Sequence, residues 1–328
     1  MTTHARAIGL IRLGALGDLV LVSSLSQALD AAGHRVVLVT DVRYQAIADS
    51  MPGVQRVVLF DRRRHDSLRG LQSLAREIGA LDLALDLQHK PRTQVLGRLL
   101  HTRELRSLRL RSAWSGLLAL VGRDHVFEDT HQIVRNLELV DDVVELASPP
   151  LPALDVAREP GRRVALAVGA AHAAKRWPAD RFGLLARRLH EQGFDLCVLV
   201  GPGEEDLLQS VQRAAGRELA STLGQGVEAI LDHCRRSALV VSNDSGPAHL
   251  ASAVGTPVVT LFGPTSWRRW RPLGPGHVLS LELTCQPCSN HGRDRCPRQH
   301  HRCMLDLDVE RVLDACAHVC ADTGPIFR

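Results

Sequence analysis

Short apolar segments alternate with helical segments along the chain, and this alternation limits the possible folds more than any other feature. Residues 7–13 form an apolar segment, which is followed by a glycine turn and a helical run over 19–31. The same order begins again at residues 163–168, and the apolar segment 239–241 also leads into a helix. Apolar strands joined through helices form parallel sheets that are buried on both faces. The sequence therefore predicts an α/β fold.

A proline-rich segment divides the chain of 328 residues into two similar halves. Residues 148–152 and 158–161 are dense in proline and predict a stiff, extended linker. The length also exceeds the usual size of one domain. We therefore predict two Rossmann-like domains, 1–155 and 160–328, with the option that the C-terminal helix packs back on the first domain. Helical spacing over 126–146 predicts one more helix before the linker.

Composition narrows the class of partner. Phe, Trp and Tyr make up only 3% of the residues, so stacking platforms for nucleic acid are scarce and nucleic acid is disfavoured as a partner. The net charge is +4, but residues 87–123 carry eight Lys and Arg against the single acid Glu104, which indicates an anionic partner. We find neither a signal peptide nor a membrane span in the sequence, and we expect a cytoplasmic location.

Residues 239–249, with the sequence LVVSNDSGPAH, predict a strand that runs through a polar turn into a helix. The polar residues 242–245 are of types that cap helix amides, and Pro247 suits the first helical turn. Such a helix N-terminus attracts phosphate, and His249 is expected about one turn inside the helix, within reach of the same ligand. The alternative is an ordinary capped helix with a surface histidine.

Two carboxylates follow strands in positions that allow either a structural or a functional role. Gly14 and Gly17 do not form the G-x-G-x-x-G fingerprint, so a classical NAD site is disfavoured. Asp18 is either a first-turn carboxylate favoured by the helix dipole or a general base at a crevice between the domains. Glu205 either caps a helix or accepts a hydrogen bond from a ribose hydroxyl.

Four motifs occur in a specific order along the chain. They are IRLGALGD at 11–18, KRWP at 175–178, SNDSGPAH at 242–249 and LFGPT at 261–265. Together they resemble the heptosyltransferases of glycosyltransferase family 9, over nearly the full length. The resemblance implies a GT-B fold, in which two Rossmann-like domains with parallel sheets face each other. It further implies an inverting enzyme that moves heptose, or a similar sugar, from an ADP-sugar to a hydroxyl of the lipopolysaccharide core or a related acceptor.

The resemblance also assigns roles to individual residues, and it implies that catalysis requires no cofactor. Asp18 matches the family's general base, and Lys175 matches the lysine that meets the donor phosphates. The remaining donor-binding positions match Glu205, Asp244, Ser245, Gly246 and His249. Ala170 and Ala171 depart from the family, because relatives often carry Ser or Thr there and offer a hydroxyl to the donor diphosphate.

The first domain is expected to hold an anionic glycolipid or oligosaccharide acceptor. The candidate contacts are Arg62, Arg63, Lys90 and Arg92. The first two belong to a run of three arginines, for which a solvated loop is the alternative interpretation. The same charge would favour peripheral contact with the anionic inner face of the inner membrane, without insertion.

Four cysteines of the second domain have the spacing of a metal-binding loop over residues 285–303. They are Cys285, Cys288, Cys296 and Cys303. Four thiolates can hold zinc or iron tetrahedrally, and the alternative is free thiols packed in a loop. Cys316 and Cys320, four residues apart on the last helix, are expected in the core.

Two other functions fit part of the pattern. A nucleotide-sugar epimerase can share the two-domain fold, but it would consume a UDP-sugar without any acceptor. A catalytically silent relative, stabilised by a metal at the cysteine loop, would serve as a binding module. Product analysis separates the first alternative from a transferase, and metal content together with donor hydrolysis separates the second.

Overall fold

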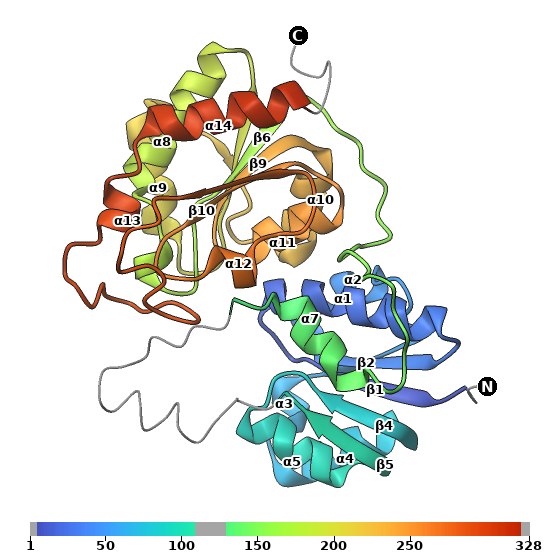
Figure 1. Ribbon diagram of the computed structural model, residues 1–328. Helices are drawn as coiled ribbons and strands as arrows, with labels where there is room; N and C mark the ends of the chain where they lie inside the picture. Colours follow the sequence, from blue (N-terminus) through green and yellow to red (C-terminus); the bar gives the residue numbers. More distant parts are fainter. Residues whose placement is uncertain (1–4, 109–128, 323–328) are drawn as a thin grey trace. The chain divides into compact units, whose positions relative to one another are not determined.

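Two parallel sheets organise the part of the chain that the computed structural model describes, residues 5–108 and 129–322 (Figure 1). The chain divides into two units. Among the described residues, the first comprises residues 5–108 and 132–155, and the second comprises residues 129–131 and 156–322. Every strand pair is parallel, so the predicted α/β class is confirmed.

The first unit has a five-stranded sheet in the order β3-β2-β1-β4-β5. Its strands are β1 (Ala7–Ile11), β2 (Arg35–Asp41), β3 (Arg56–Phe60), β4 (Leu81–Asp86) and β5 (Thr102–Ser107). Its helices are α1 (Leu16–Ala31), α2 (Gln45–Asp49), α3 (Arg62–His65), α4 (Leu68–Ile78), α5 (Pro91–Leu99) and α7 (Gln132–Leu137), with short 3-10 turns η1 (Val42–Tyr44) and η2 (Glu138–Val140). The central strand β1 is almost entirely buried, as expected for a strand covered on both faces.

The second unit has a six-stranded sheet in the order β11-β10-β9-β6-β7-β8. Its strands are β6 (Arg163–Ala167), β7 (Asp195–Leu199), β8 (Ala220–Ser221), β9 (Ser237–Asn243), β10 (Val258–Phe262) and β11 (Gly276–Ser280). Its helices are η3 (Ala173–Lys175), α8 (Ala179–Glu191), α9 (Glu205–Ala215), α10 (Val227–Arg236), α11 (Gly246–Ala253), α12 (Trp267–Trp270), α13 (Arg302–Leu305) and α14 (Val309–Asp322). All seven residues of β9 are buried, which explains its run of apolar and small side chains.

The C-terminal helix, for which packing on the first domain was considered, has its core contacts inside the second unit. α14 packs on α8 and on the strands β9, β10 and β11. Cys316 and Cys320 are buried in this core, as predicted. Among the helices of residues 5–108 and 129–322, none has the length and apolar character needed to cross a membrane.

One local prediction and one alternative interpretation in the first unit were wrong. Within the described part of residues 126–146, the α-helix covers only Gln132–Leu137 and then tightens into η2. The arginine run forms the one-turn helix α3 instead of a loop, because the Asp61 carboxylate accepts a hydrogen bond from the Arg63 amide and caps the turn.

Candidate functional site

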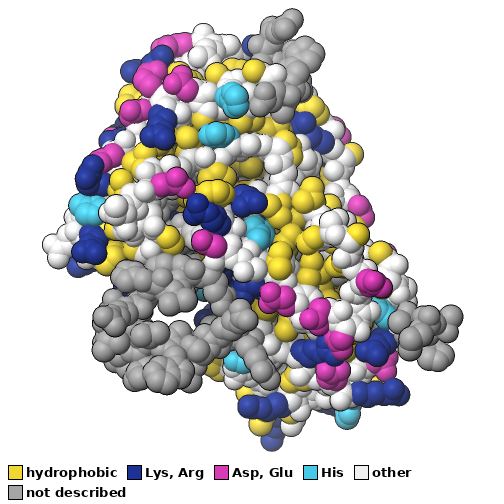
Figure 2. Space-filling view, viewed as in Figure 1, with side chains coloured by type: hydrophobic (Ala, Val, Ile, Leu, Met, Phe, Trp, Pro, Cys, Tyr) yellow, Lys and Arg dark blue, Asp and Glu magenta, His cyan; other side chains and the backbone are white. Residues whose placement is uncertain are grey.

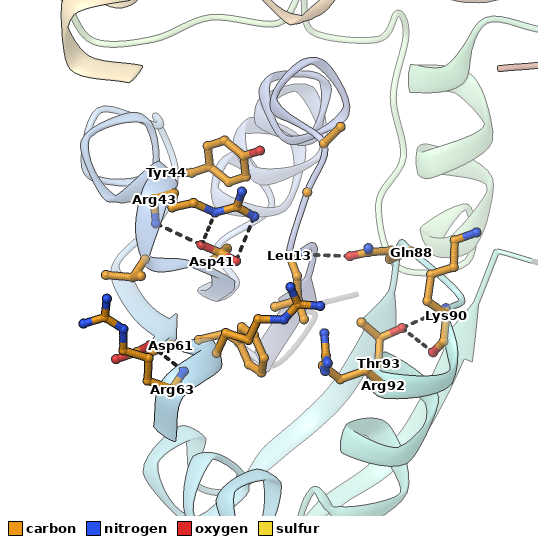
Figure 3. A pocket seen from close by; sticks show the side chains of 15 residues that line it. Leu13, Asp41, Arg43, Tyr44, Asp61, Arg63, Gln88, Lys90, Arg92 and Thr93 are labelled. Carbon is orange, nitrogen blue, oxygen red and sulfur yellow. Dashed lines mark hydrogen bonds and ion pairs between the residues drawn. The ribbon is translucent and has the colours of Figure 1, made fainter. Parts of the chain in front are cut away.

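A cavity of about 1010 Å³ opens at the carboxyl edge of the first sheet (Figure 3). Its walls come from the segments that follow β1, β2, β3 and β4. The lining residues are Leu13, Gly14, Ala15, Asp41, Val42, Arg43, Tyr44, Phe60, Asp61, Arg62, Arg63, Gln88, Lys90, Arg92 and Thr93. In open α/β sheets this edge is where ligands bind.

The cavity gathers the cations predicted for acceptor contacts. Arg62, Arg63, Lys90 and Arg92 all line it. The Arg92 guanidinium lies 5.3 Å from the centre of the Phe60 ring and forms an ion pair with Asp66. These four cations come from two elements, α3 and the start of α5.

A further cation that lines the cavity, Arg43, was not predicted from the sequence, because it belongs to no motif and its position depends on the fold. Its Nε and Nη2 donate to the two carboxylate oxygens of Asp41 at 2.9 and 3.1 Å. Burial would raise the pKa of Asp41, but the hydrogen bonds and charge of Arg43 outweigh burial and hold the pKa of Asp41 below its ordinary value. The cavity wall therefore contains a fixed ion pair beside Tyr44.

The buried carboxylate of Asp86 stabilises the loop that carries Lys90. Asp86, which is 1% exposed, accepts from the amides of Gln88 and His89 at 3.1 and 2.9 Å. It also accepts from the Thr93 hydroxyl at 3.0 Å. These hydrogen bonds fix the course of the loop and thereby the direction in which its cations point.

Basic side chains do not dominate the face of the molecule shown in Figure 2. Figure 2 shows dark blue Lys and Arg side chains interspersed with magenta Asp and Glu side chains on the face in view. Of the basic stretch predicted over residues 87–123, Arg109, Arg111 and Arg123 lie outside the described residues. Of the described cations of this stretch, Lys90 and Arg92 line the cavity, whereas Arg103 and Arg106 form ion pairs with acids outside it.

Asp18 stands in the first turn of α1, as predicted, and is paired with a cation that sequence reasoning did not single out. The Arg12 guanidinium forms an ion pair with the Asp18 carboxylate, and its Nη1 donates to the Leu87 carbonyl oxygen. The Asp18 side chain is 22% exposed. Ala15, the N-cap residue of α1, provides no side-chain cap. Asp18 is the acidic residue in the first turn of α1, where the helix dipole favours negative charge.

In the second unit, a lysine, an aspartate and a threonine meet at the carboxyl ends of three adjacent strands. The Lys175 ammonium lies 2.8 Å from Asp244 Oδ2, and the side chains are 12% and 6% exposed. The Thr265 hydroxyl donates to the same Asp244 oxygen at 2.6 Å. Lys175 follows β6, Asp244 follows β9 and Thr265 follows β10. Parallel pairing of β9 with β10 thus brings the turn at Thr265 beside Asp244.

The expected capping of α11 by residues 242–245 was wrong. Asn243 accepts from the Trp177 amide at 2.9 Å and donates to the Val168 carbonyl at 2.8 Å, while Asp244 faces Lys175. Ser245 is the N-cap residue, but its side chain makes no cap hydrogen bond. Helix α11 therefore begins with backbone amides that these side chains leave uncapped, and uncapped amides are what an anion at a helix N-terminus binds.

Trp177 anchors the loop that carries Lys175. The side chain is 1% exposed and meets the Phe182 ring edge-on at 4.9 Å. Its indole nitrogen donates to the Leu307 carbonyl oxygen at 2.8 Å, and its amide donates to Asn243. One residue thus ties together the lysine loop, the end of β9 and the segment before α14.

The other predicted donor positions lie around the same edge. Gly246 begins α11, and His249 is buried within it. Glu205 is exposed, whereas the preceding Glu204 turns inward and accepts from the Gly201 amide at 2.8 Å. A Cβ atom placed on Gly169, after β6, would lie 2.0 Å from Glu204 Oε1. Of the two acids, Glu204 is the one that approaches the end of β6. The sequence alone could not show which of the two adjacent glutamates lies there.

The cysteine loop brings its four thiols near one another. Burial, followed by the nearby thiols of Cys288, Cys296 and Cys285, raises the pKa of Cys303 to about 12. Cys285 Sγ also lies 3.8 Å from His300 Nε2. Within residues 5–108 and 129–322, however, no group of three or more His, Cys, Asp or Glu side chains is arranged to hold a metal ion. The predicted zinc or iron site is therefore not supported, and none of the eight cysteines, all of which lie in the described residues, forms a disulfide.

A comparison with protein families assigns the chain. The family described as glycosyltransferase family 9 (heptosyltransferase) matches residues 71–295. The chain belongs to glycosyltransferase family 9. This family match covers both units and includes the motifs around Lys175 and Asp244.

Individual curated relatives of this family 9 chain match it over only part of its length. It is 30% identical over 154 residues to lipooligosaccharide heptosyltransferase 2 of Campylobacter jejuni, covering 43% of this chain and 45% of that protein. It is 33% identical over 105 residues to lipopolysaccharide heptosyltransferase 3 of Escherichia coli, covering 30% of each chain. The matches thus span less than half the length of these curated relatives.

Solved structures of relatives match nearly the whole chain. The family 9 glycosyltransferase of Veillonella parvula has a TM-score of 0.80 at 20% identity and covers 97% of this chain and 98% of its own. The ADP-heptose lipopolysaccharide heptosyltransferase II of Escherichia coli has a TM-score of 0.74 at 17% identity and covers 97% and 99%. At this identity the likeness concerns the fold, and the predicted GT-B fold is confirmed.

Proposed function

We propose that this chain is an inverting glycosyltransferase that transfers heptose, or a similar sugar, from an ADP-sugar to a hydroxyl group of the lipopolysaccharide core or a related acceptor. The observation that carries the proposal is the cluster of Lys175, Asp244 and Thr265 at the ends of adjacent strands in a family 9 chain. The names of the curated relatives support heptose as the sugar, and the solved structure named for ADP-heptose supports adenine as the base.

In the proposed reaction, Asp18 removes the proton from the acceptor hydroxyl while that oxygen attacks the anomeric carbon of the donor. The new glycosidic bond forms as the bond to the diphosphate breaks, and ADP leaves with the electron pair. Lys175 and the amides at the start of α11 then stabilise the negative charge that develops on the diphosphate. Preorganised groups of this kind supply the largest part of the rate enhancement in many enzymes.

The cavity of the first unit is the proposed acceptor site. Its volume of about 1010 Å³ is at the upper end of the range for small-molecule pockets and suits several sugar units. Arg62, Arg63, Lys90 and Arg92 would pair with the phosphates or carboxylates of an anionic glycolipid or oligosaccharide. The same cations would support a cytoplasmic enzyme that works at the anionic inner face of the inner membrane by peripheral contact.

The proposal is tested with Asp18→Asn and a matched control, Asp180→Asn, which removes an exposed first-turn carboxylate from α8. We expect Asp18→Asn to slow transfer by ~10²–10⁴-fold with unchanged ADP affinity, because general-base catalysis is typically of that size. The control should retain full activity. Transfer is followed by mass spectrometry of the product with ADP-heptose and a truncated core acceptor. A folded Asp18→Asn protein within twofold of wild type would contradict the assignment, and turnover of a UDP-sugar without acceptor would favour an epimerase.

A further inference from the structure

The stem of Lys175 lies against a glycine of the cysteine loop. Gly292 has a φ of +101°, and a Cβ atom added there would lie 2.6 Å from Lys175 Cδ and 2.9 Å from Lys175 Cγ. No side chain fits at those distances unless the lysine moves. The Lys175 ammonium group at the far end of this stem is paired with Asp244, so displacing the stem displaces the ammonium group as well.

The same segment is attached to the lysine loop at three further points beyond this contact. The Ala174 amide donates to the Arg293 carbonyl oxygen at 3.1 Å. The His301 ring lies with Nε2 2.8 Å from the Ala174 carbonyl oxygen, so Nε2 carries the proton and donates. His172 Nδ1 pairs with Asp294 Oδ1 at 3.1 Å. The loop that ends in Lys175 therefore has one wall made by residues 292–301.

At its other end, the segment is attached to the turn that carries Thr265. The amides of Cys288 and Ser289 both donate to the Pro264 carbonyl oxygen, at 2.8 and 3.0 Å. The Ser289 hydroxyl then accepts from the Gly292 amide at 3.0 Å. Residues 288–301 thus connect the two strand ends whose side chains meet at Asp244.

We propose that residues 288–301 form a clamp that sets the position of the Lys175 ammonium group, with Gly292 and His301 as positioning residues for donor binding. This inference rests on the proposed function, in which Lys175 contacts the donor diphosphate. A lysine side chain has four rotatable bonds and loses more rotamer entropy than most side chains when it is ordered. A wall against its stem removes much of that freedom before the donor arrives, and preorganisation of this kind increases affinity.

The test compares Gly292→Ala with Gly216→Ala, a matched control. Gly216 also has a positive φ, +70°, but no atom lies within 4 Å of its added Cβ, so the control places alanine at a positive φ without the contact. ADP affinity is measured by calorimetry on the full chain. We expect Gly292→Ala to weaken ADP binding about tenfold, within the loss expected for a contact to a charged group, and Gly216→Ala to leave ADP affinity unchanged.

The contact with Lys175 is isolated by repeating Gly292→Ala in a Lys175→Ala background. With the stem removed, the two shortest contacts of the added methyl group disappear and only His172 Cβ, at 3.1 Å, stays close to it, so the double variant should bind ADP within twofold of Lys175→Ala. An equal loss in both backgrounds would show a general disturbance of the loop and overturn the clamp. Gly292→Ala with wild-type affinity would also overturn it. If Lys175→Ala itself binds ADP normally, the donor role of Lys175 fails, and the clamp fails with it.

His301 provides an independent check. His301→Ala removes the donor to the Ala174 carbonyl oxygen, whereas the amide of His301→Gln can replace it. We expect His301→Ala to weaken ADP binding and His301→Gln to restore most of the loss. Equal ADP affinities for the two variants would exclude His301 as a positioning residue.

Discussion

Replacing Lys175 by Met is expected to destabilise the second unit and to weaken donor binding, and the two effects can be separated. Met keeps an apolar stem against Gly292 but lacks the ammonium group that lies 2.8 Å from Asp244 Oδ2. Asp244 is only 6% exposed on its side chain, so the variant leaves a buried carboxylate whose remaining hydrogen bond from the described residues comes from Thr265. An uncompensated buried charge is costly.

The size of the effect follows from the burial of the pair. Removing one partner of a buried ion pair typically costs ~3–5 kcal/mol, and the 12% exposure of Lys175 places this pair at the lower end, about 3 kcal/mol. For a unit of this size each kcal/mol lowers Tm by roughly 2–4 °C, so we expect a decrease of roughly 6–12 °C. Adding Asp244→Asn removes the carboxylate and keeps an oxygen for Thr265, so the double variant should recover to within about 1 kcal/mol of wild type.

Donor binding should not recover with stability. Loss of the lysine contact to a diphosphate costs ~1.5–3 kcal/mol, or roughly 10–100-fold in the Kd for ADP, in both the single and the double variant. Urea unfolding and calorimetry with ADP measure the two quantities on the same preparations. A Lys175→Met protein as stable as wild type, or stability losses that simply add in the double variant, would refute the buried-pair reasoning.

Three further predictions concern the rest of the molecule. Replacing Arg62 and Arg63 by Ala should raise the KM for an anionic acceptor at low salt and have less effect above 0.1 M, where the screening length is about 10 Å; an effect independent of salt would argue against charge recognition. Because the pKa of Asp41 is held below its ordinary value, the stabilisation by its pair with Arg43 is present above about pH 4 and is lost as the pH falls through the lowered pKa. Urea unfolding of wild type and Arg43→Ala should therefore differ by a constant amount from pH 5 to 7 and converge below pH 4. Iodoacetamide at pH 8 should leave Cys303 unmodified in the folded protein, because burial and neighbouring thiols raise its pKa to about 12, and peptide mass spectrometry should detect its modification only after unfolding.

The strands and the edge that carries the site could be predicted because burial on both faces leaves a clear pattern. The apolar run before Ser242 and the turn after it predicted both β9 and the start of α11. Parallel pairing then placed the turn at Thr265 beside Asp244 without any knowledge of distances. These features depend on local sequence and on sheet geometry, and both can be inferred from one chain.

The partners of individual polar side chains could not be predicted, because they come from distant segments or depend on the course of a loop. Asn is a residue type that often caps helices, yet the side-chain oxygen of Asn243 accepts a hydrogen bond from the backbone amide of Trp177, 66 positions earlier in the chain. The inward turn of Glu204 and the pairing of Arg12 with Asp18 likewise depend on how loops leave their strands. Four cysteines at metal-like spacing indicated a metal, but spacing alone does not determine the geometry of four thiols in a folded loop.

The anchoring of Trp177 has a consequence for how the lysine loop fluctuates. An element tied to the core at one end by Asn243 and Leu307 can open only when buried contacts open with it. Amide hydrogen exchange at residues 174–177 should therefore be slow and close to that of the neighbouring sheet, unlike the fast exchange usual for a surface loop. Lys175 is then carried by a slowly opening loop, and in the proposed function a nucleotide that arrives there would meet a surface already in its bound shape.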